Sequence, residues 1–186
     1  MDTEKRIRDA WIALRCQSGE IRAFDELVTW MERPLLYYAT KLTGSEERAL
    51  DVLQDVWIKA FRGIRKLKDP SSLRSWLYHI THGVAVDSIR HNAPREQREV
   101  HLPMETLQET EEPSFSDSDA AVLHEALDDI SPSHRDALVL HFLEGFSIAE
   151  IARITSCSEG TVKSRIHYAK REIKQILLRG GYANRQ

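Results

Sequence analysis

Three helix-start signals follow one another closely between residues 131 and 159, and they constrain the fold more than any other feature of the chain. Ser131-Pro132 combines an N-cap residue with a proline that is favoured in the first helical turn. Ser147 is followed three residues later by a glutamate, which is the spacing of a capping box. Ser158-Glu159 pairs a cap with an acidic side chain that favours the positive end of a helix dipole. These signals predict helices over residues 132–144, 148–155 and 159–178.

The second and third of these helices, with the short turn between them, predict a helix-turn-helix. Ile151, Ala152 and Ile154 on the first helix face an apolar stripe on the second, where Val162, Ile166 and Ala169 recur at i, i+4 and i+7. The opposite face of the last helix carries short polar and cationic side chains, which suit base edges and phosphates in a major groove. A three-helix bundle with a solvated basic face is the alternative. The outward residues are Lys163, Ser164, His167, Lys170, Arg171 and Lys174.

The rest of the chain also has helical periodicity, without the strict alternation of strands. We expect a helix over residues 46–63, a second that starts at a Ser72 N-cap and ends near residue 91, and two stretches within 21–42 that meet near Pro34. Between residues 93 and 119 the sequence has three prolines and no sustained helical period, which indicates a linker. The predicted fold is therefore all-α, with two small helical domains joined by an acidic flexible linker, and the C-terminal domain is a helix-turn-helix. The expected boundaries are 1–92, 93–119 and 120–186.

Charge is unevenly distributed, although the formal net charge is only −3. Residues 99–129 contain ten acidic side chains and no Lys or Arg, whereas residues 59–98 and 153–186 are basic. Two basic lobes on either side of an acidic connector suit a polyanionic partner. Clustering of charge on solvated helix faces is the alternative.

The helix expected over residues 46–63 is amphipathic. Val52, Leu53, Val56, Trp57, Ala60 and Phe61 form its predicted buried stripe. Ile58 lies among polar residues on the outward face, where an exposed apolar residue is consistent with a protein-docking surface; an incidental exposed residue is the alternative. The predicted outward residues are Asp51, Gln54, Asp55, Ile58, Lys59 and Arg62.

The segment from residue 66 to residue 90 mixes cations with aromatic rings, a combination that suits single-stranded nucleic acid. The alternative is that both rings belong to the protein core. The residues concerned are Lys66, Lys68, Arg74, Trp76, Tyr78 and Arg90.

Several other classes of protein do not fit the sequence. It has neither a signal peptide nor a long apolar run, so no membrane insertion and a cytoplasmic location are expected. His79 and His82 lack a third ligand at metal-binding spacing, so we expect no metal and no cofactor, and a metal-dependent hydrolase is remote. No nucleophile–base pair is present, which predicts that the protein is not an enzyme.

Three stretches together resemble the extracytoplasmic-function (ECF) group of bacterial sigma factors, in the sigma-70 family: ALDVLQDVWIKAFR, SWLYHITHGVAVDSIR and LHFLEGFSIAEIARITSCSEGTVKSRIHYAK. The likeness extends over about residues 19–178. It implies a subunit that binds core RNA polymerase, directs it to promoters and helps to open the DNA. It also implies promoter DNA as a partner, duplex at the −35 element and single-stranded at the −10 element, and an anti-sigma factor. A free-standing helix-turn-helix regulator that binds duplex DNA is the alternative.

The resemblance assigns roles to individual residues. Asp51, Gln54 and Asp55 would dock on the polymerase clamp, in the outward face that also carries Ile58, Lys59 and Arg62. The −10 strand would be captured by Lys66, Lys68, Ser71, Ser72, Arg74, Trp76, Tyr78, His79, His82 and Arg90. The −35 element would be read by Glu159, Thr161, Lys163, Ser164, Arg165, His167, Tyr168, Lys170 and Arg171.

This sequence departs from the family pattern at four positions where arginine is frequent: His79, His82, His141 and Tyr168. Histidine is mostly neutral at pH 7, so we expect weaker phosphate contacts. Promoter affinity is then predicted to rise as the pH falls from about 7.5 to about 6, because the histidines gain charge in that range.

Overall fold

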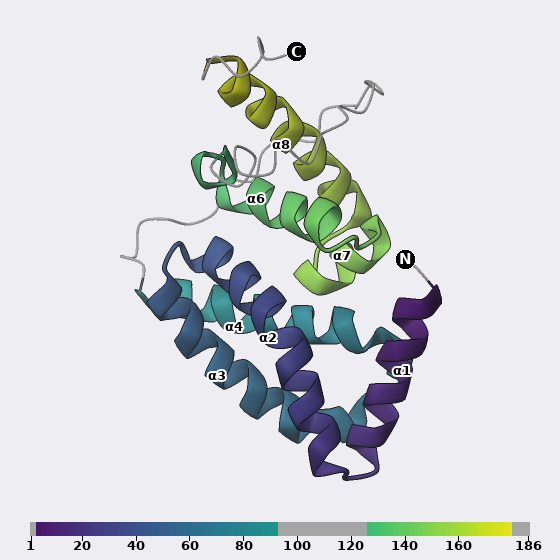
Figure 1. Ribbon diagram of the computed structural model, residues 1–186. Coiled ribbons are helices and arrows are strands. Elements are labelled where there is room, and N and C mark those ends of the chain that lie inside the picture. The colour runs from purple at the N-terminus through teal and green to yellow at the C-terminus, as the bar shows by residue number, and fades with distance from the viewer. Residues whose placement is uncertain (1–2, 93–125, 180–186) are drawn as a thin grey trace.

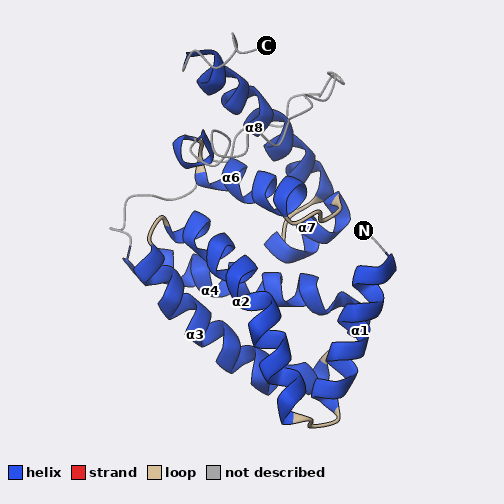
Figure 2. Ribbon diagram, viewed as in Figure 1, coloured by secondary structure: helices blue, strands red, loops and turns tan. Residues whose placement is uncertain are grey.

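The computed structural model describes residues 3–92 and 126–179, and every regular element in these two ranges is helical (Figures 1 and 2). The predicted all-α class is confirmed for this part of the chain. The predicted linker, residues 93–119, and the exact domain boundaries lie outside the described residues, so they stay predictions.

Four helices form the N-terminal part: α1 (Thr3–Gln17), α2 (Ile21–Thr43), α3 (Glu46–Gly63) and α4 (Leu73–Asn92). Short 3₁₀ turns, Ile64–Lys66 and Pro70–Ser72, join α3 to α4. The helices enclose a core in which Leu27, Tyr38, Val56, Leu77 and Ala85 are fully buried. The predicted bounds of α3 are confirmed.

Local signals explain why α2 ends where α3 begins. Gly44 takes a left-handed conformation, with φ at 66°, and its backbone N–H donates to the carbonyl of Thr40. Glycine adopts this conformation without steric cost, so a tight turn is possible here. The side chain of Ser45 then accepts from the backbone N–H of Arg48 and caps α3.

Two expectations for the N-terminal part are wrong. Pro34 lies inside one continuous α2 instead of between two helical stretches. Proline removes one helical hydrogen bond, but Met31 before it and Leu35 after it are both buried on the same side of α2, and their burial favours continuation. Ser72 is not the cap of the next helix, because Asp69 accepts from the backbone N–H of Ser71 and begins the 3₁₀ turn that leads into α4.

The C-terminal part contains α6 (Pro132–Leu138), a π-helical turn (Val139–Leu143), α7 (Ile148–Thr155) and α8 (Glu159–Arg179). The predicted capping box is confirmed: Ser147 accepts from the backbone of Glu150, whose carboxylate accepts in return. Ser158 accepts from the backbone of Thr161 and caps α8, as expected. Pro132 is the first residue of α6, but the side chain of Ser131 makes no capping bond.

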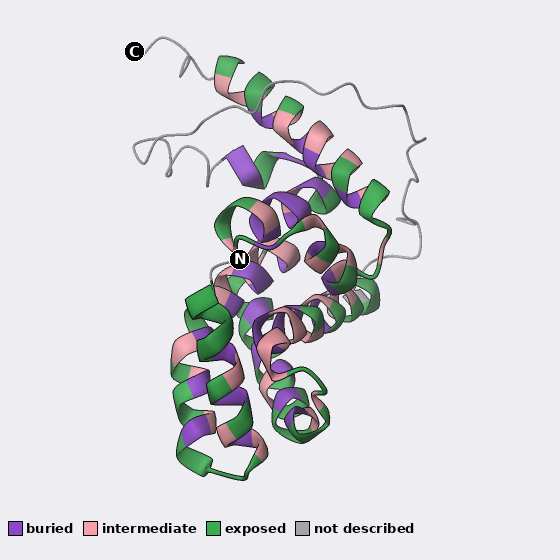
Figure 3. Cartoon of the chain, turned by 90° about the vertical axis from the view of Figure 1, so that its right-hand side faces the viewer, coloured by how far each residue is buried: buried purple, intermediate pink, exposed green. Residues whose placement is uncertain are grey.

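The two sets of helices pack directly against each other. α4 lies along α7, and α2 meets α6, so α6 and α7 lie between the N-terminal helices and α8 (Figure 1). Side chains buried in both parts form one continuous hydrophobic core cluster, and Figure 3 shows how buried and exposed positions alternate along each helix. Residues separated by 70 or more positions are therefore in contact.

Candidate nucleic-acid and protein interfaces

The outer face of α3 is available to a partner as predicted, since Asp51, Gln54, Asp55, Lys59 and Arg62 are all exposed. Val52, Leu53, Val56 and Ala60 are buried on the opposite side, which is why the polar residues point outward. The helix begins at a capped serine and starts with Glu46 and Glu47, so acidic charge meets the positive end of its dipole. The face combines carboxylates with cations.

This face is also more apolar than the sequence predicts. Ile58 is 47% exposed, as expected for a docking residue. Phe61 was expected to be buried but is 66% exposed, although its ring packs at nearly a right angle to that of Phe24 on α2, at a centroid distance of 5.2 Å. Leu50 is exposed as well, and its place eight residues before Ile58 is the sequence signal that would have identified it.

A shallow hollow lies beside this face, between α3 and α4. Asp51, Asp55 and Lys59 line it from α3, and Asp87 and His91 line it from α4. Asp87 and His91 were not predicted as interface residues. Among the described residues no group of three potential ligands is arranged to hold a metal ion.

The basic segment after α3 remains on the surface. Lys66 and Lys68 are exposed on the turns between α3 and α4, and Arg90 is exposed near the end of α4. Ser71 is held in place, because it donates to Asp69 and accepts from Arg6 of α1 at 3.1 Å. The cations that we predict to follow a phosphate backbone are therefore accessible.

The aromatic residues of the same segment do not form a surface. Trp76 is half-buried and packs over Gly63, where an added Cβ would lie 3.0 Å from Cζ2 of the indole. Tyr78 is fully buried, with its ring 5.1 Å from that of Tyr38 and 5.0 Å from that of Phe146. Burial and the nearby Glu144 raise the pKa of Tyr78 far above its usual value. Tyr78 is therefore a core residue in this structure, as the alternative has it, and its predicted role in capturing the −10 strand stays a prediction.

Three other predicted strand-capture residues of α4 point toward the C-terminal helices. Arg74 is 9% exposed and forms an ion pair with Glu144 at 3.2 Å. Nδ1 of His79 lies 2.9 Å from the carbonyl oxygen of Ile154, and Nε2 of His82 lies 3.3 Å from Oδ2 of Asp136. The predicted rise of promoter affinity on acidification is not tested by these contacts and stays a prediction.

Asp9 of α1 is a buried ionisable residue that sequence reasoning missed. Its side chain is fully buried, and neither carboxylate oxygen has a hydrogen-bond partner. Burial raises its pKa to about 6, although Arg74 opposes the shift. The signal was present in the sequence, because Asp9 shares a helical face with the buried Ala13 and Cys16 at spacings of four and seven residues.

In the helix-turn-helix the predicted inward residues pack against the core: Ile151, Ile154, Val162, Ile166 and Ala169 are buried, and Ala152 is half-buried. Ser156 in the turn has a left-handed backbone, with φ at 54°, which lets the chain reverse between α7 and α8. The turn therefore fixes which face of α8 points outward.

The outward face of α8 is accessible. Glu159, Lys163 and Arg171 are exposed, and the remaining predicted −35 residues are half-exposed: Thr161, Ser164, Arg165, His167, Tyr168 and Lys170. Several of them also contact other side chains. Tyr168 stacks on His134, and the ammonium of Lys170 lies 5.1 Å from the ring centre of Phe142. No described helix has the length and apolar character needed to cross a membrane.

Two family models match the chain, one in each of the two helical parts. Sigma-70 region 2 matches residues 27–95, and Sigma-70, region 4 matches residues 120–173. The first match includes α3 and α4, and the second includes the helix-turn-helix.

Curated relatives resemble the whole chain. The ECF RNA polymerase sigma factor SigM of Mycobacterium tuberculosis is 30% identical, with 95% of this chain and 86% of the relative covered. The RNA polymerase sigma-H factor of Pseudomonas aeruginosa is 29% identical, with 91% and 94% covered.

Solved structures share the fold. CnrH, in complex with the cytosolic domain of CnrY, superposes with a TM-score of 0.65 at 24% identity over 91% of this chain and 96% of that chain. The sigma factor RpoE of Bartonella quintana, in complex with the anti-sigma factor NepR, gives a TM-score of 0.64 at 24% identity over 84% and 98%.

Proposed function

This chain belongs to the ECF group of RNA polymerase sigma factors, and we propose how its exposed residues divide the work of promoter recognition. As a sigma factor it binds core RNA polymerase, directs it to promoters and helps to open the DNA for initiation.

The outer face of α3 is the proposed polymerase-binding surface. It presents Asp51, Gln54 and Asp55 beside the exposed apolar side chains of Ile58 and Phe61. An apolar centre with charged residues around it is typical of a protein interface, where charge sets orientation and burial supplies affinity. Lys59 and Arg62 continue the same face.

The outward face of α8 is the proposed −35 reader. Lys163 and Ser164 lie in the first turns of the helix, which are the turns that enter the major groove when a helix-turn-helix binds duplex DNA. Thr161 and Arg171 are placed to contact phosphates, which position the protein without specifying sequence. His167 completes the set that faces base edges.

The exposed cations Lys66, Lys68 and Arg90 are proposed to hold the phosphate backbone of the single-stranded −10 element. Such binding opens the promoter by favouring the unpaired strand over the duplex, and it involves no bond chemistry. We therefore propose a binding protein that is not an enzyme, and one that works in the cytoplasm, where core polymerase and chromosomal DNA are present.

An anti-sigma factor is a further proposed partner. CnrH and the Bartonella RpoE were both solved with a partner protein, CnrY in one case and the anti-sigma factor NepR in the other. A protein that covers the outer face of α3 would block the polymerase from docking there.

One observation carries this division of work: a single chain presents an exposed acidic and apolar helix face on α3 and an outward basic helix on α8. A free-standing regulator, the alternative, would bind duplex DNA through α8 while its first domain senses a signal or dimerises, and it would not need the docking face of α3. The match of Sigma-70 region 2 to residues 27–95 favours the sigma factor, since that region includes α3.

The test is run-off transcription with purified core polymerase on genomic fragments, with wild type and Asp55→Arg. We expect promoter-dependent transcripts with wild type and at least a tenfold loss of core affinity for Asp55→Arg, because a charge reversal creates repulsion at the interface. Asp25→Arg, at an exposed position on α2, is the matched control and should retain activity. If Asp55→Arg also removes duplex binding by α8, the proposed division of work is wrong.

A further inference from the structure

The turns between α3 and α4, residues 64–72, carry two of the cations that we propose to hold the −10 strand, and we refer to these residues as the capture loop. α1 packs along this loop (Figure 1). Lys66 and Lys68 are both exposed, and Leu67 between them is half-buried against the hydrophobic core. At Leu67 the backbone leaves the first 3₁₀ turn and becomes extended, with φ at −65° and ψ at 111°. The conformation of this one residue therefore decides how the two lysines are placed relative to each other.

The side chain of Gln17 holds the backbone at this point. Its amide nitrogen, Nε2, donates to the carbonyl oxygen of Ile64 at 3.0 Å and to that of Leu67 at 2.8 Å. Gln17 is half-buried, so both hydrogen bonds are partly shielded from water. An amide side chain has two N–H donors, and here both are used on one short stretch of backbone. The two bonds fix the first 3₁₀ turn and the residue at which it ends.

α1 is itself fixed in place, which allows it to support the capture loop. Ile12 and Ala13 are buried on the side of α1 that faces the core. Gln17 is the last residue of α1, and Gly19 just after it takes a φ of 90°, so the chain turns directly into α2. A Cβ added to Gly19 would lie 3.4 Å from a guanidinium nitrogen of Arg65, so this turn also lies against the capture loop.

A second contact holds the other end of the capture loop. Arg6 of α1 donates to the hydroxyl of Ser71 at 3.1 Å, and Ser71 in turn donates to Asp69 at 2.7 Å. Arg6 precedes Gln17 by about three helical turns, so the two side chains lie on the same side of α1. α1 therefore contacts the capture loop at both ends. The Arg6 contact is exposed to water, and Gln17 is the stronger anchor.

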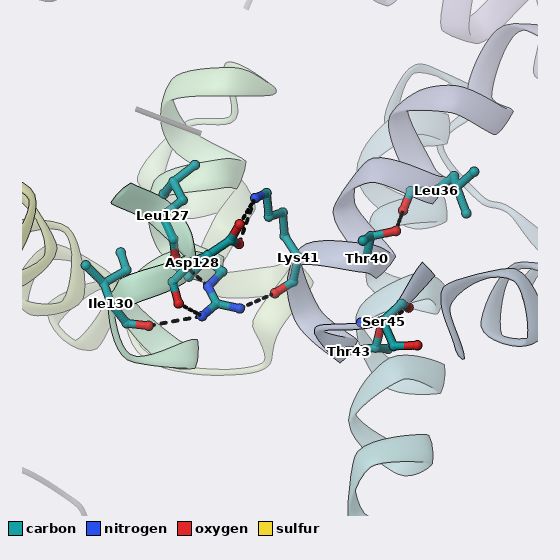
Figure 4. Close-up of polar contacts among 9 residues, drawn as sticks. Leu36, Thr40, Lys41, Thr43, Ser45, Leu127, Asp128 and Ile130 are labelled. Atoms are coloured by element: carbon teal, nitrogen blue, oxygen red, sulfur yellow. Dashed lines mark hydrogen bonds and ion pairs between the residues drawn. The ribbon is translucent and has the colours of Figure 1, made fainter. Parts of the chain in front are cut away.

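The capture loop is supported from within the N-terminal part of the chain. The polar contacts drawn in Figure 4 instead join that part to the chain before α6: Lys41 forms an ion pair with Asp128 at 2.7 Å, and Arg135 donates to the carbonyl oxygen of Lys41 at 2.9 Å. These contacts lie at the C-terminal end of α2 and include no residue of the capture loop. A change at Gln17 therefore alters the capture loop without removing them.

We propose that Gln17 is a positioning residue for −10 recognition: it presets the backbone between Lys66 and Lys68 so that both ammonium groups reach phosphates of the unpaired strand together. The inference rests on the proposed function, which assigns these two lysines to that strand. It adds a residue of α1, and α1 precedes the stretch that matches Sigma-70 region 2, residues 27–95. A loop that is already ordered loses less conformational entropy when it binds, so preorganisation increases affinity.

The experiment compares wild type with Gln17→Met, which keeps a similar volume but has no N–H donor. The probe is a fluorescently labelled single-stranded oligonucleotide that carries the −10 element of a promoter found by run-off transcription. It is titrated with the full-length protein bound to core polymerase. We expect Gln17→Met to weaken binding by roughly tenfold, because the loss of two neutral hydrogen bonds has about this effect on an equilibrium. Gln175→Met, at an exposed position of α8 outside the predicted DNA-binding residues, is the matched control and should bind as wild type.

Salt dependence distinguishes a positioning role from a loss of stability. If Gln17→Met misplaces the lysines, the slope of log affinity against log salt concentration should fall by about 0.7 for each phosphate contact that is lost from a single strand. A variant that is only less stable has fewer folded molecules but the same contacts, so its slope stays at the wild-type value. Thermal unfolding followed by circular dichroism establishes that each variant is folded. Unchanged affinity, or weaker binding with an unchanged slope, overturns the proposal.

A double-mutant cycle supplies a second measurement, and Gln17→Leu, which also lacks a donor, supplies a second variant. Replacing both Lys66 and Lys68 by alanine should cost less affinity in either Gln17 variant than in wild type, because the lysines are already misplaced there. Equal costs in the two backgrounds would contradict the positioning role. If the lysine substitutions leave wild-type binding unchanged, or if core-bound wild type does not bind the oligonucleotide, the proposed function of the capture loop fails and the role of Gln17 fails with it.

Discussion

The hydroxyl of Tyr38 in α2 donates a 2.7 Å hydrogen bond to Oδ1 of Asp136 in α6, although 98 residues separate them in the chain. Both side chains are buried, and burial together with the facing carboxylate raises the pKa of Tyr38 well above its usual value. The phenol therefore stays protonated and keeps its role as donor. The other oxygen of Asp136 faces His82, so this carboxylate connects α6 to both α2 and α4.

Tyr38→Phe should lower the free energy of unfolding by about 1.5–3 kcal/mol, the usual contribution of a hydrogen bond to a charged group. Urea denaturation of the full-length protein provides the measurement. A double-mutant cycle with Asp136→Asn supplies the control, and we expect a coupling free energy of about 1 kcal/mol or more for residues in direct contact. Additive effects would show that the bond contributes no stability.

Asp9→Asn should remove a pH dependence of stability. The pKa of Asp9 is raised from 3.8 to about 6 in the folded protein, so the folded state binds more protons than the unfolded state between these values. The contribution of Asp9 to stability is therefore favourable at low pH and is lost as the pH rises through about 6, by roughly 3 kcal/mol in total.

We expect Asp9→Asn to be more stable than wild type at pH 8 and to show a flatter stability profile between pH 4 and pH 7. Chemical denaturation at a series of pH values measures this, with the exposed Asp25→Asn as control. If the free energy of unfolding changes with pH in the same way for wild type and Asp9→Asn, the raised pKa of Asp9 is contradicted.

Ser147→Ala removes the capping box of α7 and should destabilise the protein by about 1 kcal/mol. Because α7 supports α8 in the helix-turn-helix, duplex affinity should fall as well. Ser133→Ala, at an exposed position in the first turn of α6, is a suitable comparison and should change little. If the two variants are equally stable in thermal unfolding, the capping box of α7 does not contribute to the stability of the protein.

Lys163→Ala tests the proposed −35 interface by salt dependence. The substitution removes one cationic side chain that contacts either a phosphate or a base edge, so duplex binding should weaken. If the contact is to phosphate, the slope of log affinity against log salt concentration should also fall by about 1. Fluorescence anisotropy at several salt concentrations gives both quantities. Lys5→Ala, on the exposed surface of α1, removes the same charge from the other domain and should leave the slope unchanged.

Local signals were sufficient to predict most of the helices. The capping residues and glycines placed α3 and α7 at the bounds that the structure has, because caps act within one turn of the chain. Pro34 was misread, since its effect depends on whether the residues on either side are buried, and that is decided by neighbouring helices. The exposure of Phe61 was not predicted for the same reason: helical periodicity predicts which side of the helix the side chain lies on, but not how much of the ring Phe24 covers.

The candidate site was only partly predictable. The exposed faces of α3 and α8 follow from periodicity, so their residues could be identified from spacing alone. The burial of Arg74 and Tyr78 depends on Glu144 and Phe146, which come about 70 residues later in the chain. Periodicity within one helix does not predict contacts between residues so far apart in the sequence.

The π-helical turn at Val139–Leu143 has a consequence for how this protein tolerates changes in length. Such a turn accommodates one residue more than an α-helix would, and each residue of an α-helix rotates the chain by about 100°. The wider turn takes up that extra residue while the segments on either side keep their register, so deleting a single residue here would restore α-helical geometry with little rotation of Glu144 and Phe146 about the helix axis. The contacts that Glu144 and Phe146 make with α4 should therefore tolerate the loss of one residue in this turn better than the loss of one residue from an α-helical turn.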